Sequence, residues 1–366
     1  MKNKGIRIGL VCLGLAVIGV ILFLIFQPLQ SDKTEKEKIG FVMSGSIGEE
    51  GWNGMHYKGM KSACDTLEMT LLVKENVGEF TGECKSAIKE LVEDGAKMII
   101  LSSYGYSEEV KDLVKEYPEI SFYVNSSEYH EKNMTSYFVR MYQVRYLSGI
   151  IAGMQTETNT IGYVAAMANN EVNRGISAFT LGVKRANPDA EVVVAWTDSW
   201  DDEKKEKEAA KKLIEKEKAD VVTYHQNQQY VLDVADEAGV KSIGYHQAYD
   251  EYSEKYLTSV VCNWDRTYRE LIREFLQGRS NINENTWLGL EESVVDLSEY
   301  SKSVTEEEKE AVEIAKQEIL SGNDVFSGEL YDNVGELRCR DGESISDTVL
   351  LEQFDWYVEG VRFYED

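Results

Sequence analysis

The sequence has 366 residues, of which 65 are acidic and 39 basic, so its formal net charge is −26. This length favours two domains of ordinary size, and 43% hydrophobic residues can fill their cores. The acidic excess argues against nucleic acid as a partner, because phosphate contacts need clustered Lys and Arg.

The amino terminus has the pattern of a membrane segment. Three basic residues precede the uncharged apolar run 8–26, which is long enough to cross a bilayer as a helix. Basic residues on that side predict a cytoplasmic tip and an extracytoplasmic remainder. Residues 26–29 offer no small-residue cleavage site, and Cys12 lacks the small preceding residue of a lipidation signal. We therefore expect residues 1–37 to form a cytoplasmic tip, an uncleaved anchor and a tether, with a removed signal peptide as the alternative.

Strand and helix patterns alternate through the first third of the remaining chain. Apolar runs predict strands at 38–44, 71–75, 97–102, 120–125 and 137–141, and amphipathic patterns predict helices at 52–67, 80–94 and 107–117. Cys64 and Cys84 fall on the apolar faces of two of these helices, so they read as buried small hydrophobes rather than a disulfide framework.

The alternation continues in the second part. Helices are predicted at 143–154, 172–187, 202–218, 230–238, 263–277 and 305–320, and strands at 160–166, 191–197, 220–224, 242–245 and 258–261. Gly149, Ala152 and Gly153 predict close packing of the first of these helices. A hairpin-like tail, 334–338, is expected to turn at Asp341-Gly342.

This alternation predicts an α/β fold with doubly wound parallel sheets. Such sheets bind ligands beyond the carboxyl ends of their strands. The segments 167–171 and 196–200 follow two predicted strands, so the sequence places a site there.

Long segments of the chain resemble one family. The sequences KIGFVMSGSIGEEGWNGMHYKGM, FVRMYQVRYLSGIIAGM, IGYVAAMANNEVNRGISAFTLGVKRANPDAEVVVAWTDSWDD and LTSVVCNW are similar to basic membrane protein (BMP) substrate-binding proteins of ABC importers, which include PnrA-like nucleoside binders. The likeness covers about residues 38–365. It is closer to a branch with Gly-Trp near the first loop and Trp-x-x-Ser-Trp later, which is associated with adenine or related purines.

The resemblance implies a type I periplasmic-binding-protein fold with two doubly wound lobes, three crossovers and a ligand cleft. On this sequence, lobe 1 would comprise 38–139 with 264–286, and lobe 2 would comprise 140–263 with 287–366. The helix at 263–277 would return to lobe 1.

A purine needs aromatic faces and a few polar groups at its edge. Trp52 and Trp200 follow strand ends and match the family's stacking aromatics, and Trp264 is a third candidate for ligand contact. For each of the three, packing in the core is the alternative. The expected polar contacts are the side chains of Asn53, Asn263, His225 and Gln226, the last two being alternatively helix caps. Tyr104, Gly105 and Tyr245 also end predicted strands.

Two departures from the family pattern bear on the ligand. Nucleoside binders carry an acidic residue where this chain has Gly244-Tyr245-His246, and a lysine where it has Cys262. The missing ribose-binding carboxylate favours a free base such as adenine over a nucleoside.

The chain carries no Gly-x-Ser-x-Gly, Walker or His-Glu-x-x-His motif, so we expect no enzyme, cofactor or metal. The expected partners are a purine, an ABC permease with its ATPase, and the membrane. A nucleoside binder or a membrane-anchored sensor of the same fold remains open, and a hydrolase using His225 and His246 is a remote alternative.

Overall fold

The computed structural model describes residues 36–365 apart from 128, 250–251 and 281–284. The chain divides into the units Met1–Glu37 and Lys38–Asp366, and all helices and strands of the described ranges belong to the second unit. The predicted membrane run 8–26 and Cys12 lie outside the described residues. Within the described ranges, no helix has the length and apolar character needed to cross a membrane.

The first sheet has six parallel strands in the order β11-β5-β4-β3-β1-β2. These strands are β1 (Lys38–Val42), β2 (Thr70–Lys74), β3 (Met98–Leu101), β4 (Ser121–Asn125), β5 (Met134–Val139) and β11 (Asn285–Leu288). The accompanying helices are α2 (Trp52–Thr66), α3 (Glu83–Glu93), the short η1 (Tyr104–Tyr106), α4 (Ser107–Glu116) and α9 (Trp264–Leu276). Phe41 and Val42 belong to different core clusters. Helices therefore cover both faces, which explains the continuous apolar runs of these strands.

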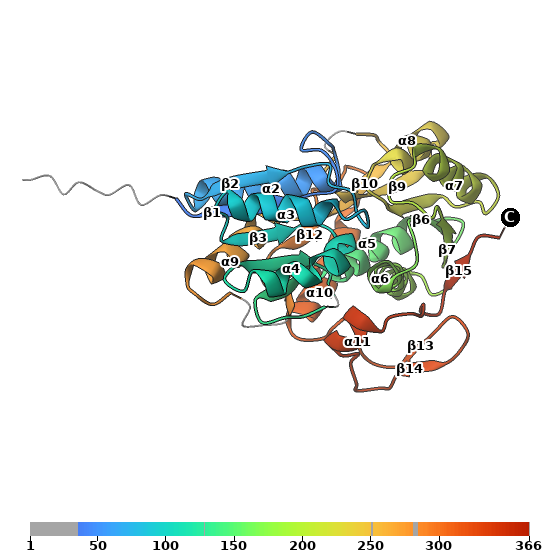
Figure 1. Cartoon of the computed structure of the whole chain (residues 1–366). Helices are drawn as coiled ribbons and strands as arrows, with labels where there is room; N and C mark the ends of the chain where they lie inside the picture. The colour runs from blue at the N-terminus through green and yellow to red at the C-terminus, as the bar shows by residue number, and fades with distance from the viewer. Residues whose placement is uncertain (1–35, 128, 250–251, 281–284, 366) are drawn as a thin grey trace, which may run out of the picture. The chain divides into compact units, whose positions relative to one another are not determined.

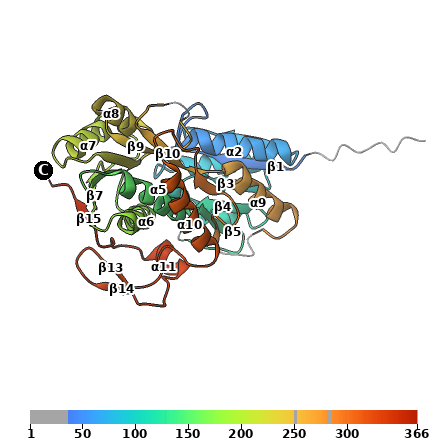
Figure 2. The same cartoon turned by 180° about the vertical axis from the view of Figure 1, so that it is seen from behind.

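The second sheet has seven strands in the order β12-β10-β9-β8-β6-β7-β15, with only the β10–β12 pair antiparallel. They are β6 (Thr160–Ala165), β7 (Glu191–Trp196), β8 (Val221–His225), β9 (Lys241–His246), β10 (Tyr256–Cys262), β12 (Val295–Leu297) and β15 (Val361–Phe363). The accompanying helices are α5 (Met141–Gln155), α6 (Asn170–Ala186), α7 (Glu203–Glu215), α8 (Tyr230–Ala238) and α10 (Glu306–Leu320). The expected α/β fold with parallel sheets is confirmed, and Figures 1 and 2 show the two sheets from opposite sides.

Helices α5 and α6 pack with their backbones in close contact. A Cβ on Gly149 would lie 2.0 Å from the carbonyl oxygen of Phe179, and a Cβ on Gly182 would lie 2.0 Å from that of Tyr146. The predicted close packing at Gly149 is confirmed. A larger residue at either position would force the helices apart.

The chain passes between the sheets at three places. It leaves the first sheet between β5 and α5 and returns from β10 into α9, which packs on α2. At that contact, a Cβ on Gly59 would lie 2.4 Å from the Cβ of Trp264. The third passage runs from β11 to β12.

The carboxy-terminal part differs most from the prediction. Strands β13 (Leu330–Tyr331) and β14 (Leu337–Cys339) form a hairpin whose turn contains Gly335 at φ +86°. The predicted hairpin turn at Asp341-Gly342 is therefore wrong, because those residues form a later turn beyond β14. Helix α11 (Asp347–Glu352) and β15 follow, and no periodic pattern long enough to predict either occurs there.

Candidate ligand-binding cleft

A cavity of about 80 Å³ lies where strand ends of the two sheets face each other. We call it the first cavity. Its lining from the first sheet and its connections is Ser44, Trp52, Glu79, Ser103, Tyr104 and Asn125, and from the second it is Asn169, Glu171, Trp200, His225, Asn227, Tyr245 and His246. Five predicted site residues are among these: Trp52, Tyr104, Trp200, His225 and Tyr245.

Trp52 begins α2 directly after Gly51, which has a φ of +82°. Its Nε1 donates a hydrogen bond of 3.2 Å to the carbonyl oxygen of Ser102. Its ring centroid lies 4.1 Å from that of His56 and 5.5 Å from that of His246. The half-buried indole therefore combines packing on the core with a place in the cavity wall.

Trp200 lies in the loop between β7 and α7. Its carbonyl oxygen accepts a hydrogen bond of 2.9 Å from the backbone N–H of Asn227, which ties this loop to the one after β8. The indole is half-buried, and its ring centroid lies 6.1 Å from that of His225 at an interplanar angle of 64°. Both indoles thus line one cavity.

A buried polar network surrounds His225 at the end of β8. The His225 Nε2 lies 3.2 Å from the Tyr245 hydroxyl and 3.4 Å from Glu171 Oε1, and its Nδ1 lies 3.4 Å from the Tyr163 hydroxyl. Behind it, the buried guanidinium of Arg145 lies 3.9 Å from the Tyr245 ring centroid. Burial lowers the pKa of His225, although the hydrogen bond with Glu171 opposes this. A neutral imidazole offers a ligand one donor or one acceptor.

Glu79 carries a carboxylate that is held by the loop after β3. It accepts hydrogen bonds from the Ser103 hydroxyl and from the Gly105 backbone N–H, the latter at 3.1 Å. A Cβ on Gly105 would lie 2.3 Å from Glu79 Oε1. Gly105 is therefore needed so that this carboxylate can approach the backbone, and it does not line the cavity itself.

Asn125 ends β4 and contributes a buried amide to the lining. It is 2% exposed, and its Nδ2 has no hydrogen-bond partner among the described residues. Leaving a buried donor unpaired costs about 1–3 kcal/mol. A ligand acceptor at this point of the cavity would satisfy it.

Four predicted contacts lie away from the cavity wall. Asn53 is buried and donates to Glu49 at 2.8 Å, so it holds the preceding loop. Gln226 is buried, with its amide 2.8 Å from both the Thr197 hydroxyl and the Ser199 carbonyl oxygen. Asn263 is exposed and caps α9 by accepting from the Arg266 N–H at 3.0 Å, and Trp264 is buried against His56 with ring centroids 3.7 Å apart.

Two further lining residues, Asn169 and Glu171, lie in the segment 167–171 where the sequence placed a site. Six lining residues were not predicted as ligand contacts, namely Ser44, Glu79, Ser103, Asn125, Asn227 and His246. Position at a strand end was a usable signal for Asn125 and His246. Glu79 carried no such signal, because the fold of an irregular loop brings it there. No group of three or more His, Cys, Asp or Glu side chains within the described ranges could hold a metal ion.

Two sheets whose strand ends enclose a cavity are the arrangement expected of a protein that binds a ligand between two lobes. A solved ABC-transporter solute-binding protein from Aeropyrum pernix has this fold, with a TM-score of 0.67 and 19% identity over 78% of this chain and 92% of its own.

The family profile described as ABC transporter substrate-binding protein PnrA-like (Bmp) matches residues 36–325, and the chain belongs to this family. A purine-binding protein of Brucella abortus is 31% identical over 89% of this chain and 93% of its own length. A putative ABC transporter glucose-binding protein of Haloferax volcanii is 30% identical over 90% of this chain and 81% of its own length. The resemblance read from the sequence is confirmed.

Proposed function

We propose that the chain is the extracytoplasmic solute-binding component of an ABC importer and binds an adenine-like purine base between Trp52 and Trp200. The observation that carries this proposal is the meeting of the two indoles in one cavity with His225 and the unpaired amide of Asn125. The purine-binding relative supports the same ligand class.

The first cavity has the chemistry that a flat heteroaromatic ring requires. Stacking on an indole contributes about 1–3 kcal/mol per base. The amide of Asn125, the neutral imidazole of His225 and the carboxylate of Glu79 provide donors and acceptors for ring nitrogens and exocyclic groups. The ligand is bound without being transformed.

The environments of His246 and Cys262 favour a free base over a nucleoside. His246 Nε2 lies 2.9 Å from the carbonyl oxygen of Gln226, and burial keeps its pKa well below the usual value. Cys262 is buried beside the Thr267 hydroxyl, and burial raises its pKa. At neutral pH neither side chain provides the carboxylate or the ammonium group that nucleoside binders of this family use.

The same proposal includes a type I periplasmic-binding fold and an amino-terminal membrane anchor. Three passages of the chain between the sheets fit a type I periplasmic-binding fold, in which two lobes close over the ligand. Residues 8–26 would anchor the protein with its binding unit outside the cell. Protease added to intact cells should degrade the binding unit, whereas complete protection would contradict this location.

Titration calorimetry on the fragment beginning at Lys36 tests the ligand. We expect adenine to bind more tightly than guanine, hypoxanthine, adenosine or guanosine, and Trp200→Ala to weaken binding by roughly tenfold to a hundredfold. Trp196→Phe is the matched control, because Trp196 stacks on Phe363 at a centroid distance of 6.2 Å and does not line the cavity. No purine binding, or an unchanged affinity in Trp200→Ala, would overturn the proposal.

A membrane-anchored sensor of the same fold is the second candidate, favoured by the permanent tether that residues 8–26 would provide. Deleting the permease or ATPase should abolish uptake of the ligand by cells if the chain serves an importer. Unchanged uptake, together with a transcriptional response lost on deleting this chain, would favour sensing.

A further inference from the structure

Arg145 in α5 is a fully buried cation without a carboxylate partner among the described residues. Its guanidinium donates to the Tyr224 carbonyl oxygen at 2.9 Å and to the Thr223 hydroxyl at 3.4 Å. Its Nε has no hydrogen-bond partner in the described part of the chain. A buried ion normally lies against an opposite charge, because its removal from water is costly. An apolar side chain of similar volume would fill this space without that cost.

The Arg145 guanidinium lies over two tyrosine rings behind the first cavity. It is 3.9 Å from the ring centroid of Tyr245 and 5.3 Å from that of Tyr163. The Tyr245 ring centroid in turn lies 4.8 Å from that of His225. The hydroxyl of Tyr245 is 3.2 Å from His225 Nε2, and that of Tyr163 is 3.4 Å from His225 Nδ1. The two rings on which Arg145 packs therefore carry the hydroxyls that hold both nitrogens of His225.

Opposite charges act on His225 from its two sides. Glu171 Oε1 lies 3.4 Å from Nε2, and a neighbouring carboxylate favours the charged imidazolium. Burial, followed by the positive charges of Arg145 and Arg174, nevertheless holds the pKa of His225 below its ordinary value. The charged and titratable groups that face the imidazole are Arg145 from α5, Glu171 and Arg174 from α6, Tyr163 from β6, and Tyr245 and His246 from β9.

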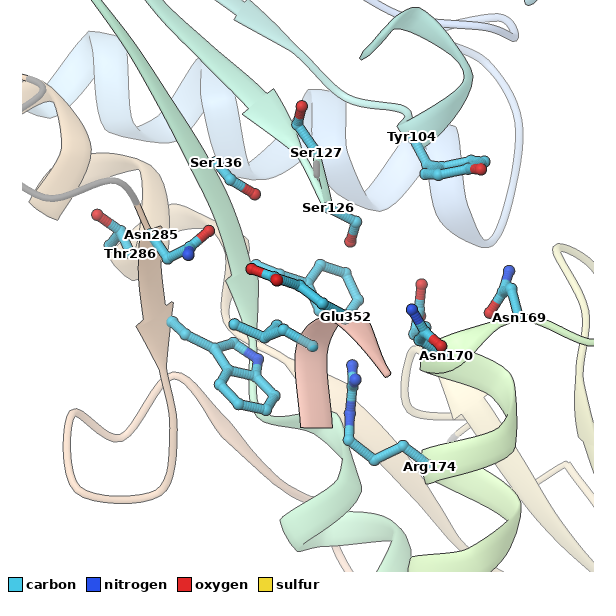
Figure 3. A pocket seen from close by; sticks show the side chains of 14 residues that line it. Tyr104, Ser126, Ser127, Ser136, Asn169, Asn170, Arg174, Asn285, Thr286 and Glu352 are labelled. Atoms are coloured by element: carbon cyan, nitrogen blue, oxygen red, sulfur yellow. The ribbon is translucent and has the colours of Figure 1, made fainter. Parts of the chain in front are cut away.

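The contacts of Arg174 lie elsewhere. Its side chain extends from α6 toward a neighbouring cavity of about 210 Å³, as Figure 3 shows, and donates a hydrogen bond to the Leu350 carbonyl oxygen. Its guanidinium also lies 4.9 Å from the Trp287 ring centroid. Arg145 lines neither this cavity nor the first one. Arg145 is thus the cation whose guanidinium contacts lie around His225.

Protonation of His225 would change what the cavity wall offers a base. A neutral imidazole keeps one acceptor, whereas imidazolium has two donors and no acceptor. Imidazolium would also form a charge-assisted hydrogen bond with Glu171, whose carboxylate lines the first cavity. That carboxylate would then be less available to accept from an amino group of the ligand.

We infer that Arg145 is a positioning residue whose buried positive charge keeps His225 neutral and thereby leaves Glu171 available to the base. The part that concerns the base rests on the proposed function, whereas the part that concerns His225 does not. Affinity for the base then changes little between neutral and mildly acidic pH.

The test compares Arg145→Met, which removes the charge, with Arg145→Lys, which retains it. NMR titration without ligand follows the ring signal of His225, assigned by its loss in His225→Gln. We expect His225 to protonate at a higher pH in Arg145→Met than in wild type, with Arg145→Lys closer to wild type. Calorimetry with adenine compares about pH 7.5 with about pH 6. Affinity should fall less than about twofold in wild type and roughly threefold to tenfold in Arg145→Met, because more of its imidazole is charged at the lower pH.

Two results overturn the inference. One is an unmoved titration of His225 in Arg145→Met. The other is an affinity loss in Arg145→Met that is equal at both pH values, which a purely structural role of Arg145 would produce. Absence of adenine binding by the wild type would refute the proposed function, and the titration of His225 without ligand would still decide the inference.

Further variants keep the test decisive if Arg145→Met does not fold. Arg145→Gln also removes the charge, while its amide can still donate to the Tyr224 carbonyl oxygen, and it should move the His225 titration in the same direction. Arg185→Gln is the matched control, because Arg185 is an exposed guanidinium of α6 that donates to Glu318 at 3.0 Å. His225 should titrate there as in wild type. An equal shift in Arg185→Gln and in the Arg145 variants counts against the inference.

Discussion

The Trp52 indole and the His246 imidazole meet edge to face, with ring centroids 5.5 Å apart and an interplanar angle of 69°. Trp52 begins α2 beside the first sheet, whereas His246 ends β9 in the second. This aromatic contact joins the two walls of the first cavity. Any change that charges the imidazole or removes the indole therefore acts on the binding site and on the packing between the sheets together.

Acid should weaken the fold through three buried histidines. Burial is the largest cause that lowers the pKa of His56, His225 and His246 below the ordinary histidine value of about 6.5. A depressed folded-state pKa means that the unfolded chain binds more protons, so the stabilisation is complete above about pH 6.5 and declines as the pH falls. Thermal unfolding at about pH 7.5 and about pH 5.5 measures the effect.

Comparison with His246→Gln measures the contribution of that imidazole together with its coupling to His56 and His225, because protonation of carboxylates changes both proteins equally. The groups facing His246 are the Gln226 carbonyl oxygen and the rings of Trp52 and Tyr245. Its charged or titratable neighbours are Arg145, His225 and His56. The variant should lose less stability between the two pH values. An identical loss in both proteins would refute the assignment.

The two indoles should differ in what they contribute to stability. Trp52 packs on His56 and Trp264 at centroid distances of 4.1 Å and 5.6 Å, whereas Trp200 has one such aromatic neighbour, His225. We expect Trp52→Ala to lower the free energy of unfolding by about 2–4 kcal/mol and Trp200→Ala by about 1 kcal/mol or less. Urea unfolding without ligand measures both values, and equal losses would contradict this division.

Replacing Gly149 by alanine should separate α5 from α6. The new Cβ would lie 2.0 Å from the Phe179 carbonyl oxygen, and relief of that clash requires a backbone shift costing about 3 kcal/mol. Gly175→Ala in α6 is the control, since its Cβ would meet nothing closer than His225 Nδ1 at 3.4 Å. The control should stay within about 1 kcal/mol of wild type. Similar unfolding midpoints for the two variants would disprove the close approach.

The carboxy-terminal segment should be an integral part of the fold. Leu350 is the fully buried residue of α11, and Leu350→Ala should lower the free energy of unfolding by about 2–5 kcal/mol. Thr348→Ala, an exposed change in the same helix, should cost less than about 0.5 kcal/mol. Chemical denaturation of both variants checks this, and an unaffected Leu350→Ala would mean that α11 is not docked.

Strands buried on both faces could be predicted closely because they are continuous apolar runs. The predicted strand 160–166 corresponds to β6 at Thr160–Ala165, and the predicted helix 172–187 to α6 at Asn170–Ala186. The tail could not be predicted in this way. Strand β15 has three residues and pairs with β7, which lies far back in the sequence, so its position depends on tertiary pairing rather than on local pattern.

The predicted site residues divide in the same way, into those that line the first cavity and those whose side chains point elsewhere. Aromatic and polar residues at strand ends, such as Trp200 and His225, could be found from the sequence because all parallel strands present their carboxyl ends on one side. Asn53, Gln226, Asn263 and Trp264 met the same criterion, but their side chains form caps, loop contacts or core packing. Side-chain direction at a strand end depends on neighbours brought there by the fold.

The α/β class, the family and the region of the cleft could all be inferred from the sequence alone, because periodicity and long motifs are local properties of the chain. Which polar groups face the first cavity depends on the tertiary structure. Glu79, Asn125 and Glu171 come from three different connections of the fold, and all three line that cavity. Their convergence depends on the packing of the two sheets, and no local pattern specifies that packing.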